Sequence, residues 1–167
     1  MKRIYAALIL YAAFAMADGL PLVHALEEVP VTTHSPGNEN TQGIVSIASP
    51  YPFADTVHRL LSAFADHGIK VFATIDQQAE AAAAGLAMPP TTLILFGNPK
   101  AGTPLMLAQP RSGLDLPLKV LVSEPVPRQV SVSFNSAAYI IERHSLPPEL
   151  ASNLVPAERL IANTLQP

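Results

Sequence analysis

The segment Thr91–Phe96 (TTLILF) restricts the fold of this chain more than any other segment. It is an apolar run of strand length, preceded by Pro89-Pro90 and followed by Gly97. A strand with one solvent-exposed face alternates polar and apolar residues, whereas a continuous apolar run indicates burial on both faces. The segment therefore predicts a central strand, which needs neighbouring strands on both sides.

Four other segments have the length and composition of strands. The sequence alternates in the first and last of them, and SEPVPR forms a hairpin connection before the last. If Leu118 and Val120 face the core, Lys119 faces the other side. The four segments are Gly43–Ser49, Lys70–Ile75, Leu116–Ser123 and Gln129–Phe134.

Helices are predicted between and after these strands. Residues 53–67 carry apolar side chains at helical spacing, and Gly68 is well placed to end that helix. Asp76 is predicted to cap an alanine-rich helix that ends at Gly85. Asn135 is predicted to cap a helix through Arg143, and a terminal helix begins around Pro156. This order of elements predicts an α+β domain with a mainly antiparallel sheet of about five strands and helices packed on one face.

The N-terminus has the three-part layout of a secretory signal peptide. Lys2 and Arg3 precede an apolar run (4–17), and small residues precede two possible cleavage positions, after Ala25 or after Ala17. The run is too short for a membrane span, which needs about 20 apolar residues. We therefore expect a signal peptide (1–25), a flexible polar lead-in (26–42), one domain (43–167), and a periplasmic or secreted protein without a membrane span after cleavage.

Composition excludes several classes of function. Cleavage after Ala25 removes two of the ten bases and one of the thirteen acids, which leaves a formal charge of −4 and argues against binding of nucleic acid. The chain has no cysteine, which rules out disulfides, thiolate zinc sites, iron–sulfur clusters and thiol catalysis. No G-x-S-x-G, Walker or dinucleotide-binding motif occurs. We predict no cofactor.

The segment between the third and fourth predicted strands is rich in capping signals. Asn98-Pro99 and Thr103-Pro104 each place a capping side chain before a proline, and Gly102 favours two short turns over one helix. The segment is either a well-capped loop or a place where free N–H groups at helix starts bind an anion or carboxylate.

This segment also resembles the domain-of-unknown-function 302 family. The resemblance lies in Phe96-Gly97-Asn98-Pro99, in Gly102-Thr103 and in Asp115-Leu116-Pro117-Leu118-Lys119, and it extends over about residues 44–145. It implies a curved sheet with helices, similar to the TATA-binding-protein-like class, and no established activity. Members often have histidine after the aspartate of the second strand, where this chain has Gln77, which weakens any role for an imidazole there.

Six polar residues at strand ends and in loops are predicted to form one ligand-binding cleft. The simpler alternative for two of them is that Asp115 and Lys119 form an exposed ion pair, which contributes about 0–1 kcal/mol. The cleft residues are Asp76, Asn98, Lys100, Thr103, Asp115 and Lys119.

We expect a non-catalytic module that binds a small molecule or a protein, with self-association left open. One alternative is an enzyme that uses Asp76 and Lys119 as acid and base. The other is a periplasmic metal-binding protein, although the candidate ligands follow no HExxH or His-x-His spacing. These candidate metal ligands are His58, His67, His144, Met88 and Met106.

Overall fold

A computed structural model describes residues 38–39 and 42–167 of the chain. The predicted signal peptide (1–25), with cleavage after Ala25 or Ala17, and most of the predicted lead-in (26–42) lie outside the described residues. Within them, the strands form one antiparallel sheet in the order β1-β2-β6-β5-β4-β3. The strands are β1 (Asn38–Glu39), β2 (Ile44–Ala48), β3 (Lys70–Asp76), β4 (Thr91–Gly97), β5 (Leu118–Val126) and β6 (Gln129–Asn135).

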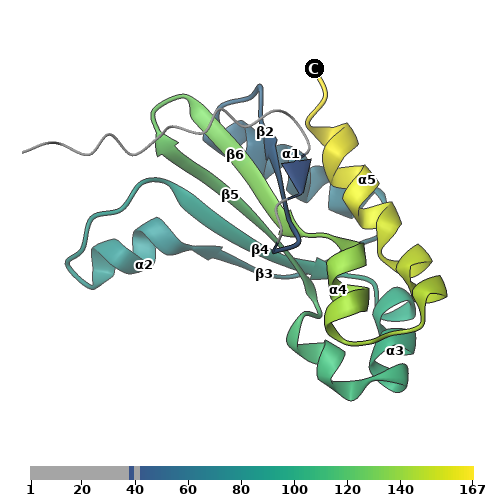
Figure 1. Cartoon of the computed structure of the whole chain (residues 1–167). Coiled ribbons are helices and arrows are strands. Elements are labelled where there is room, and N and C mark those ends of the chain that lie inside the picture. The colour runs from purple at the N-terminus through teal and green to yellow at the C-terminus, as the bar shows by residue number, and fades with distance from the viewer. Residues whose placement is uncertain (1–37, 40–41) are drawn as a thin grey trace, which may run out of the picture. The chain divides into compact units, whose positions relative to one another are not determined.

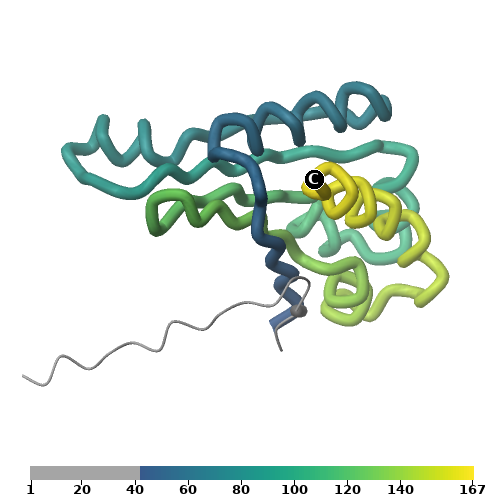
Figure 2. Tube along the Cα trace, turned by 90° about the horizontal axis from the view of Figure 1, so that it is seen from above, coloured from purple at the N-terminus to yellow at the C-terminus, as the bar shows by residue number. Residues whose placement is uncertain are grey.

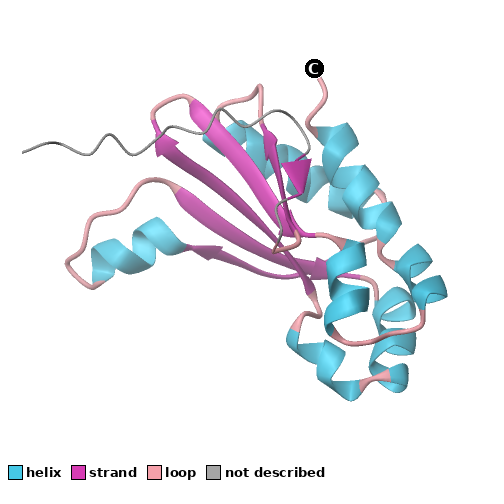
Figure 3. Cartoon of the chain, viewed as in Figure 1, coloured by secondary structure: helices cyan, strands magenta, loops and turns pink. Residues whose placement is uncertain are grey.

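The sheet has helices on one face, as the sequence predicts (Figures 1 and 3). Two helices, α1 (Phe53–Asp66) and α5 (Val155–Thr164), lie next to each other and bury the core face of the strands (Figure 2). The rings of Phe64 on α1 and Phe96 on β4 stack with centroids 4.2 Å apart. The amphipathic pattern of α1 therefore defines the main core.

Strand β4 lies between β3 and β5, which confirms the prediction of an internal strand. Its two faces differ, however. Ile94 and Phe96 are fully buried against α1 and α5, whereas Leu93 and Leu95 on the other face are half-buried. The prediction that β4 is buried on both faces is therefore only partly correct, because the helices cover one face of the sheet.

A second group of helices gathers where β4 ends and β5 begins (Figure 1). It consists of α3 (Pro99–Ala108), the 3-10 helix η1 (Pro110–Leu114), α4 (Ala137–Arg143) and the 3-10 helix η2 (Pro148–Asn153). A smaller core that includes Leu105, Ile140 and Leu154 holds this helical end together. The domain thus has two hydrophobic clusters, one under the sheet and one among these helices.

Two local predictions in this region are wrong. Residues 99–108 form one helix with Pro104 inside it, not two successive turns, and Thr103 is an exposed helical residue instead of a cap. Burial of Leu105 favours the continuous helix despite the hydrogen bond that proline cannot make. The cap of α4 is Ser136, whose hydroxyl accepts from the N–H of Tyr139, because Asn135 still belongs to β6.

Helix α2 (Gln77–Ala83) lies at the other end of the β3–β4 pair (Figure 1). Asp76 caps it as predicted, since its Oδ1 atom accepts from the N–H of Ala79 at 2.9 Å. Across the described part of the chain, no helix has the length and hydrophobicity that a membrane span requires.

Candidate functional site

A cavity of about 530 Å³ lies between the two hydrophobic clusters. One wall comes from the end of β4 and the beginning of β5, a second from α3, and a third from η2 and α5. Phe72 on β3 and Phe96 on β4 line it from the sheet, and Leu160 lines it from α5. Met106, Leu116 and Leu154 line it from the helical end. Its volume lies in the range of pockets that hold small organic ligands, about 300–1,000 Å³.

Few polar side chains reach this cavity. Asn98 follows β4 and lines the cavity, and its Oδ1 atom accepts from the N–H of Lys100 at 2.9 Å. Asn153 donates from Nδ2 to the carbonyl oxygen of Ala101 at 3.0 Å, which joins η2 to α3. His67 also lines the cavity, and its Nδ1 atom lies 2.9 Å from the carbonyl oxygen of Ala63. The arrangement suits a mainly apolar ligand with a polar group near the rim.

The structure brings only two of the six predicted cleft residues to this cavity. Asn98 and Thr103 line it, whereas Lys100, on the same helix, is exposed and does not. The capping signal at Asn98 and Pro99 begins α3, and α3 forms one wall of the cavity.

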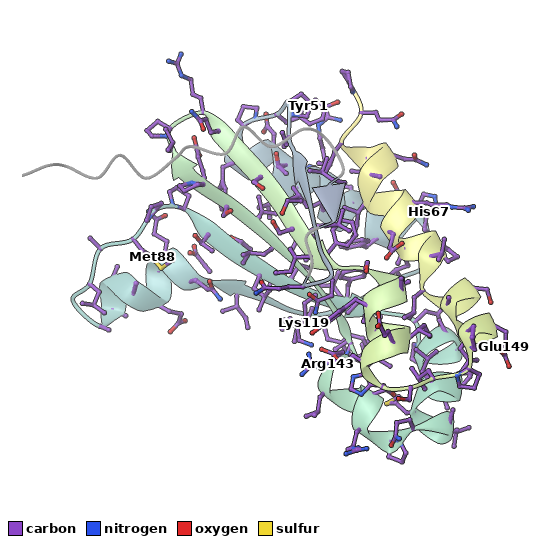
Figure 4. All side chains as sticks on the ribbon, in the orientation of Figure 1. Tyr51, His67, Met88, Lys119, Arg143 and Glu149 are labelled. Carbon is purple, nitrogen blue, oxygen red and sulfur yellow. The ribbon has the colours of Figure 1, made fainter. Side chains whose placement is uncertain are left out.

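Asp115 and Lys119 lie beside the cavity but are not paired with each other. Asp115 is buried, and its carboxylate binds His144 Nε2 at 2.6 Å and Arg143 at 3.4 Å. Lys119 instead donates from Nζ to the carbonyl oxygens of Leu114 and Pro117, each at 3.3 Å. The predicted exposed Asp115–Lys119 pair is therefore wrong. Figure 4 shows Lys119 and Arg143 near each other at the base of the sheet, as their contacts with residues 114 and 115 require.

Asp76 lies far from the other predicted residues. Its Cα pairs with Thr92 at the beginning of β4, whereas Asn98 lies six residues farther along the chain, about 20 Å away at the usual rise per residue. From Lys119 it is separated by two strand spacings and three residues along the strands, about 14 Å. Asp76 and Lys119 therefore cannot act on one substrate atom as acid and base in this arrangement.

Sequence reasoning missed the partners that bury Asp115. Arg143 ends α4 and His144 follows it, 28 and 29 residues after Asp115, and no local pattern links them to the segment before β5. Only the antiparallel pairing of β5 with β6, which carries α4 back beside Asp115, brings them together.

Metal ligands are not grouped at this end of the domain. In residues 42–167 and the short strand 38–39, no three histidine, aspartate or glutamate side chains stand close enough to hold an ion. His144 is held by Asp115, and Met88 lies at the α2 end of the domain (Figure 4). The histidines therefore give no geometric support to the metal-binding alternative.

The fold of this chain is similar to that of a protein of known structure. A crystal structure of an uncharacterized conserved DUF302 protein from Bacillus stearothermophilus is similar, with a TM-score of 0.63 and 16% sequence identity over 74% of this chain and 95% of that one. This likeness concerns the fold alone.

Proteins of higher sequence similarity come from Brucella. The chain is 40% identical over 104 residues to the fluoride-specific ion channel FluC 1 of Brucella suis and to that of Brucella abortus. The match covers 62% of this chain but only 41% and 38% of those proteins, so the chain spans about two fifths of their length. The model of the domain of unknown function DUF302 matches residues 45–164. The chain therefore belongs to the DUF302 family, whose function is unknown.

Proposed function

We propose that this domain is a non-catalytic module that binds a small, mainly apolar molecule in the cavity between β4, β5, α3 and α5. The observation that carries the proposal is a cavity of about 530 Å³ with apolar walls and a few polar groups. Burial of an apolar ligand contributes about 25 cal/mol per Å² of surface removed from water. Asn98 and His67 are among the polar side chains that line the cavity and could orient a polar substituent.

The arrangement of the predicted acid and base favours binding over catalysis. Asp76 is a helix cap at the far end of β4, and Lys119 is held by two backbone carbonyls. A substrate in the cavity would contact neither Asp76 nor Lys119, since neither residue lines it.

Binding is tested with the fluorescent probe anilinonaphthalene sulfonate, an apolar aromatic ring system that carries one anionic group. Replacement of Ala101, which lines the cavity, by leucine fills part of its volume and should weaken probe binding about tenfold. The matched control is Ala82→Leu on α2, which is exposed and outside the cavity. Equal affinities for both variants would refute the proposal. Native mass spectrometry of the purified protein then weighs any natural ligand.

We further propose that the protein is exported, on the strength of the N-terminal Lys2-Arg3 and the apolar run after them. N-terminal sequencing of the mature protein tests this. The expected first residue is Leu26 or Asp18, and an intact Met1 in the secreted or periplasmic fraction would contradict it.

A second proposal concerns the process in which the domain acts. The Brucella proteins named fluoride-specific ion channels share 40% identity with this chain over part of their length. We propose that the domain acts together with a fluoride channel. Deletion of its gene should then lower the fluoride concentration that the host tolerates, with chloride as the control salt. Unchanged fluoride tolerance would count against this role.

A further inference from the structure

The two most exposed large apolar side chains among the described residues, and a third beside them, lie on one short segment. We call residues 99–114, which form α3 and η1, the α3–η1 tip. Leu107 is 80% exposed, Leu114 is 73% exposed and Met106 is 38% exposed. Isolated exposed leucines are ordinary, but three such side chains within nine residues are an apolar surface that favours contact with another apolar phase.

The two helices of the tip repeat one pattern. On α3, Lys100, Thr103 and Leu107 follow the i, i+3, i+7 spacing and therefore share a face, and all three are exposed. On η1, Arg111 and Leu114 are three residues apart, so their side chains lie above one another. A Cβ atom on Gly113 would lie 3.6 Å from the Sδ atom of Met106, which shows that η1 folds back against α3. Each helix thus presents one leucine with one cation.

The charge of the tip differs from that of the rest of the chain. Lys100 and Arg111 are its charged residues, and residues 99–114 contain no acid, although the whole chain has a formal charge of −3. The nearby Asp115 is buried and bound to Arg143 and His144, and Glu149 lies on η2 at the side of the helical end (Figure 4).

The four other exposed large apolar side chains in the described residues each have an acid within six residues of sequence. Phe72, four residues before Asp76, has Lys70 Nζ 4.9 Å from its ring centroid, but it lies on β3 and lines the cavity. Ile75 precedes Asp76, and Leu86 follows α2, which carries Glu80 in its first turn. Val126 lies two residues after Glu124. Among the described residues, exposed leucines that have a cation but no exposed acid within six residues of sequence are therefore found at the tip alone.

We propose that the α3–η1 tip docks on the surface of a lipid bilayer that contains anionic lipid. Leucines flanked by basic residues on a helix surface bind the boundary between headgroups and acyl chains, where the leucines enter the apolar region and the cations meet the phosphates. Charge complementarity selects this occupant, since an anionic surface repels the acidic body of the domain but attracts its tip. The proposal rests on Leu107, Leu114 and the two cations of the tip, none of which lines the cavity, so it does not depend on which ligand occupies the cavity.

The chain has no tryptophan, so a single introduced tryptophan reports on its own position alone. We would prepare Leu107→Trp and Leu86→Trp in the full chain. To each we would add vesicles of phosphatidylcholine that contain about 30% phosphatidylglycerol as the anionic lipid. Emission from Leu107→Trp should shift to shorter wavelength and be quenched by brominated lipid. Leu86→Trp, at the other end of the domain, should not change. A local reporter is needed because the apolar run 4–17 can bind lipid itself.

The charge contribution is tested in the Leu107→Trp background. Lys100→Gln with Arg111→Gln should lower the affinity for anionic vesicles by about thirtyfold, and added salt should weaken binding of the parent more than that of this variant. Leu114→Trp serves as a second reporter, and circular dichroism verifies the fold of each variant. Equal responses at positions 107 and 86, or no lipid response at 107 and 114, would overturn the proposal. A shift in the emission of Leu107→Trp with a protein partner but not with vesicles would also overturn the proposal.

Discussion

The Nε2 atom of His144 lies 2.6 Å from the Oδ2 atom of Asp115, and both side chains are buried. Asp115 follows η1 just before β5, and His144 follows α4, 29 residues later. Arg143 binds the other oxygen of the same carboxylate at 3.4 Å. These contacts hold α4 against the segment that leads into β5, and thereby fix one side of the helical end.

Asp115→Ala should lower the free energy of unfolding by about 2 kcal/mol. The substitution leaves the buried imidazole of His144 without its hydrogen-bond partner, and such a loss typically costs 1–3 kcal/mol, roughly the desolvation cost of the group. Urea denaturation followed by circular dichroism measures the change. Glu142→Ala, an exposed acid on α4, is the control and should change stability by less than about 0.5 kcal/mol. Equal losses in both variants would show that the Asp115 contacts contribute nothing.

The sheet and α1 could be predicted from the sequence because their signals are local and agree with one another. Strand β4 follows two prolines and ends at Gly97. Helix α1 has apolar side chains at helical spacing, and Gly68, with a φ of +64°, follows directly where the helix ends. The continuous helix at 99–108 could not be predicted in this way. There, burial of Leu105 in a cluster of residues distant in sequence outweighs the local effect of Gly102 and Pro104.

Gly43→Ala should destabilise the domain much more than Gly85→Ala. Both glycines have a φ of +75°, so the backbone strain of an alanine is the same at the two positions. A Cβ atom on Gly43 would lie 2.1 Å from Cγ of Tyr139, whereas a Cβ atom on Gly85 would have no atom within 4 Å apart from those of its chain neighbours. We expect losses of about 3 kcal/mol and about 1 kcal/mol, respectively. Thermal and urea unfolding of the two variants give the comparison, and similar losses would mean that Tyr139 moves aside.

The candidate site was harder to predict than the fold, since it depends on which ends of the strands face each other. Asp76 ends β3, Asn98 follows β4, and both cap helices. The register of β3 with β4 nevertheless places them at opposite ends of the same strand pair. Antiparallel neighbours alternate direction, so successive strand ends do not meet at one edge as they do in a parallel sheet. The prediction of one cleft used the polar character of residues at strand ends and did not take the alternating strand direction into account.

Asp76→Ala should leave binding of anilinonaphthalene sulfonate unchanged. The carboxylate caps α2 about 17 Å from the end of β4 that borders the cavity, so its loss affects α2 alone. The missing cap should cost about 1 kcal/mol of local helix stability, which faster amide hydrogen exchange in α2 would show. Ala101→Leu serves as the positive control for lost binding. A large loss of probe affinity in Asp76→Ala would move the site to the other end of the sheet.

Asn153→Ala should weaken probe binding although it removes little of the cavity wall. The amide of Asn153 donates to the carbonyl oxygen of Ala101 and so joins η2 to α3 across 52 residues of sequence. Without this bond, worth about 1 kcal/mol, α3 is held less firmly in the position that shapes the cavity, and part of the binding free energy is used to order it. The expected loss is up to about fivefold in affinity. Asn163→Ala, on the exposed side of α5, is the matched control. If amide exchange in α3 does not accelerate in Asn153→Ala, any loss of affinity comes from direct contact with the probe, and the positioning role assigned to this bond is wrong.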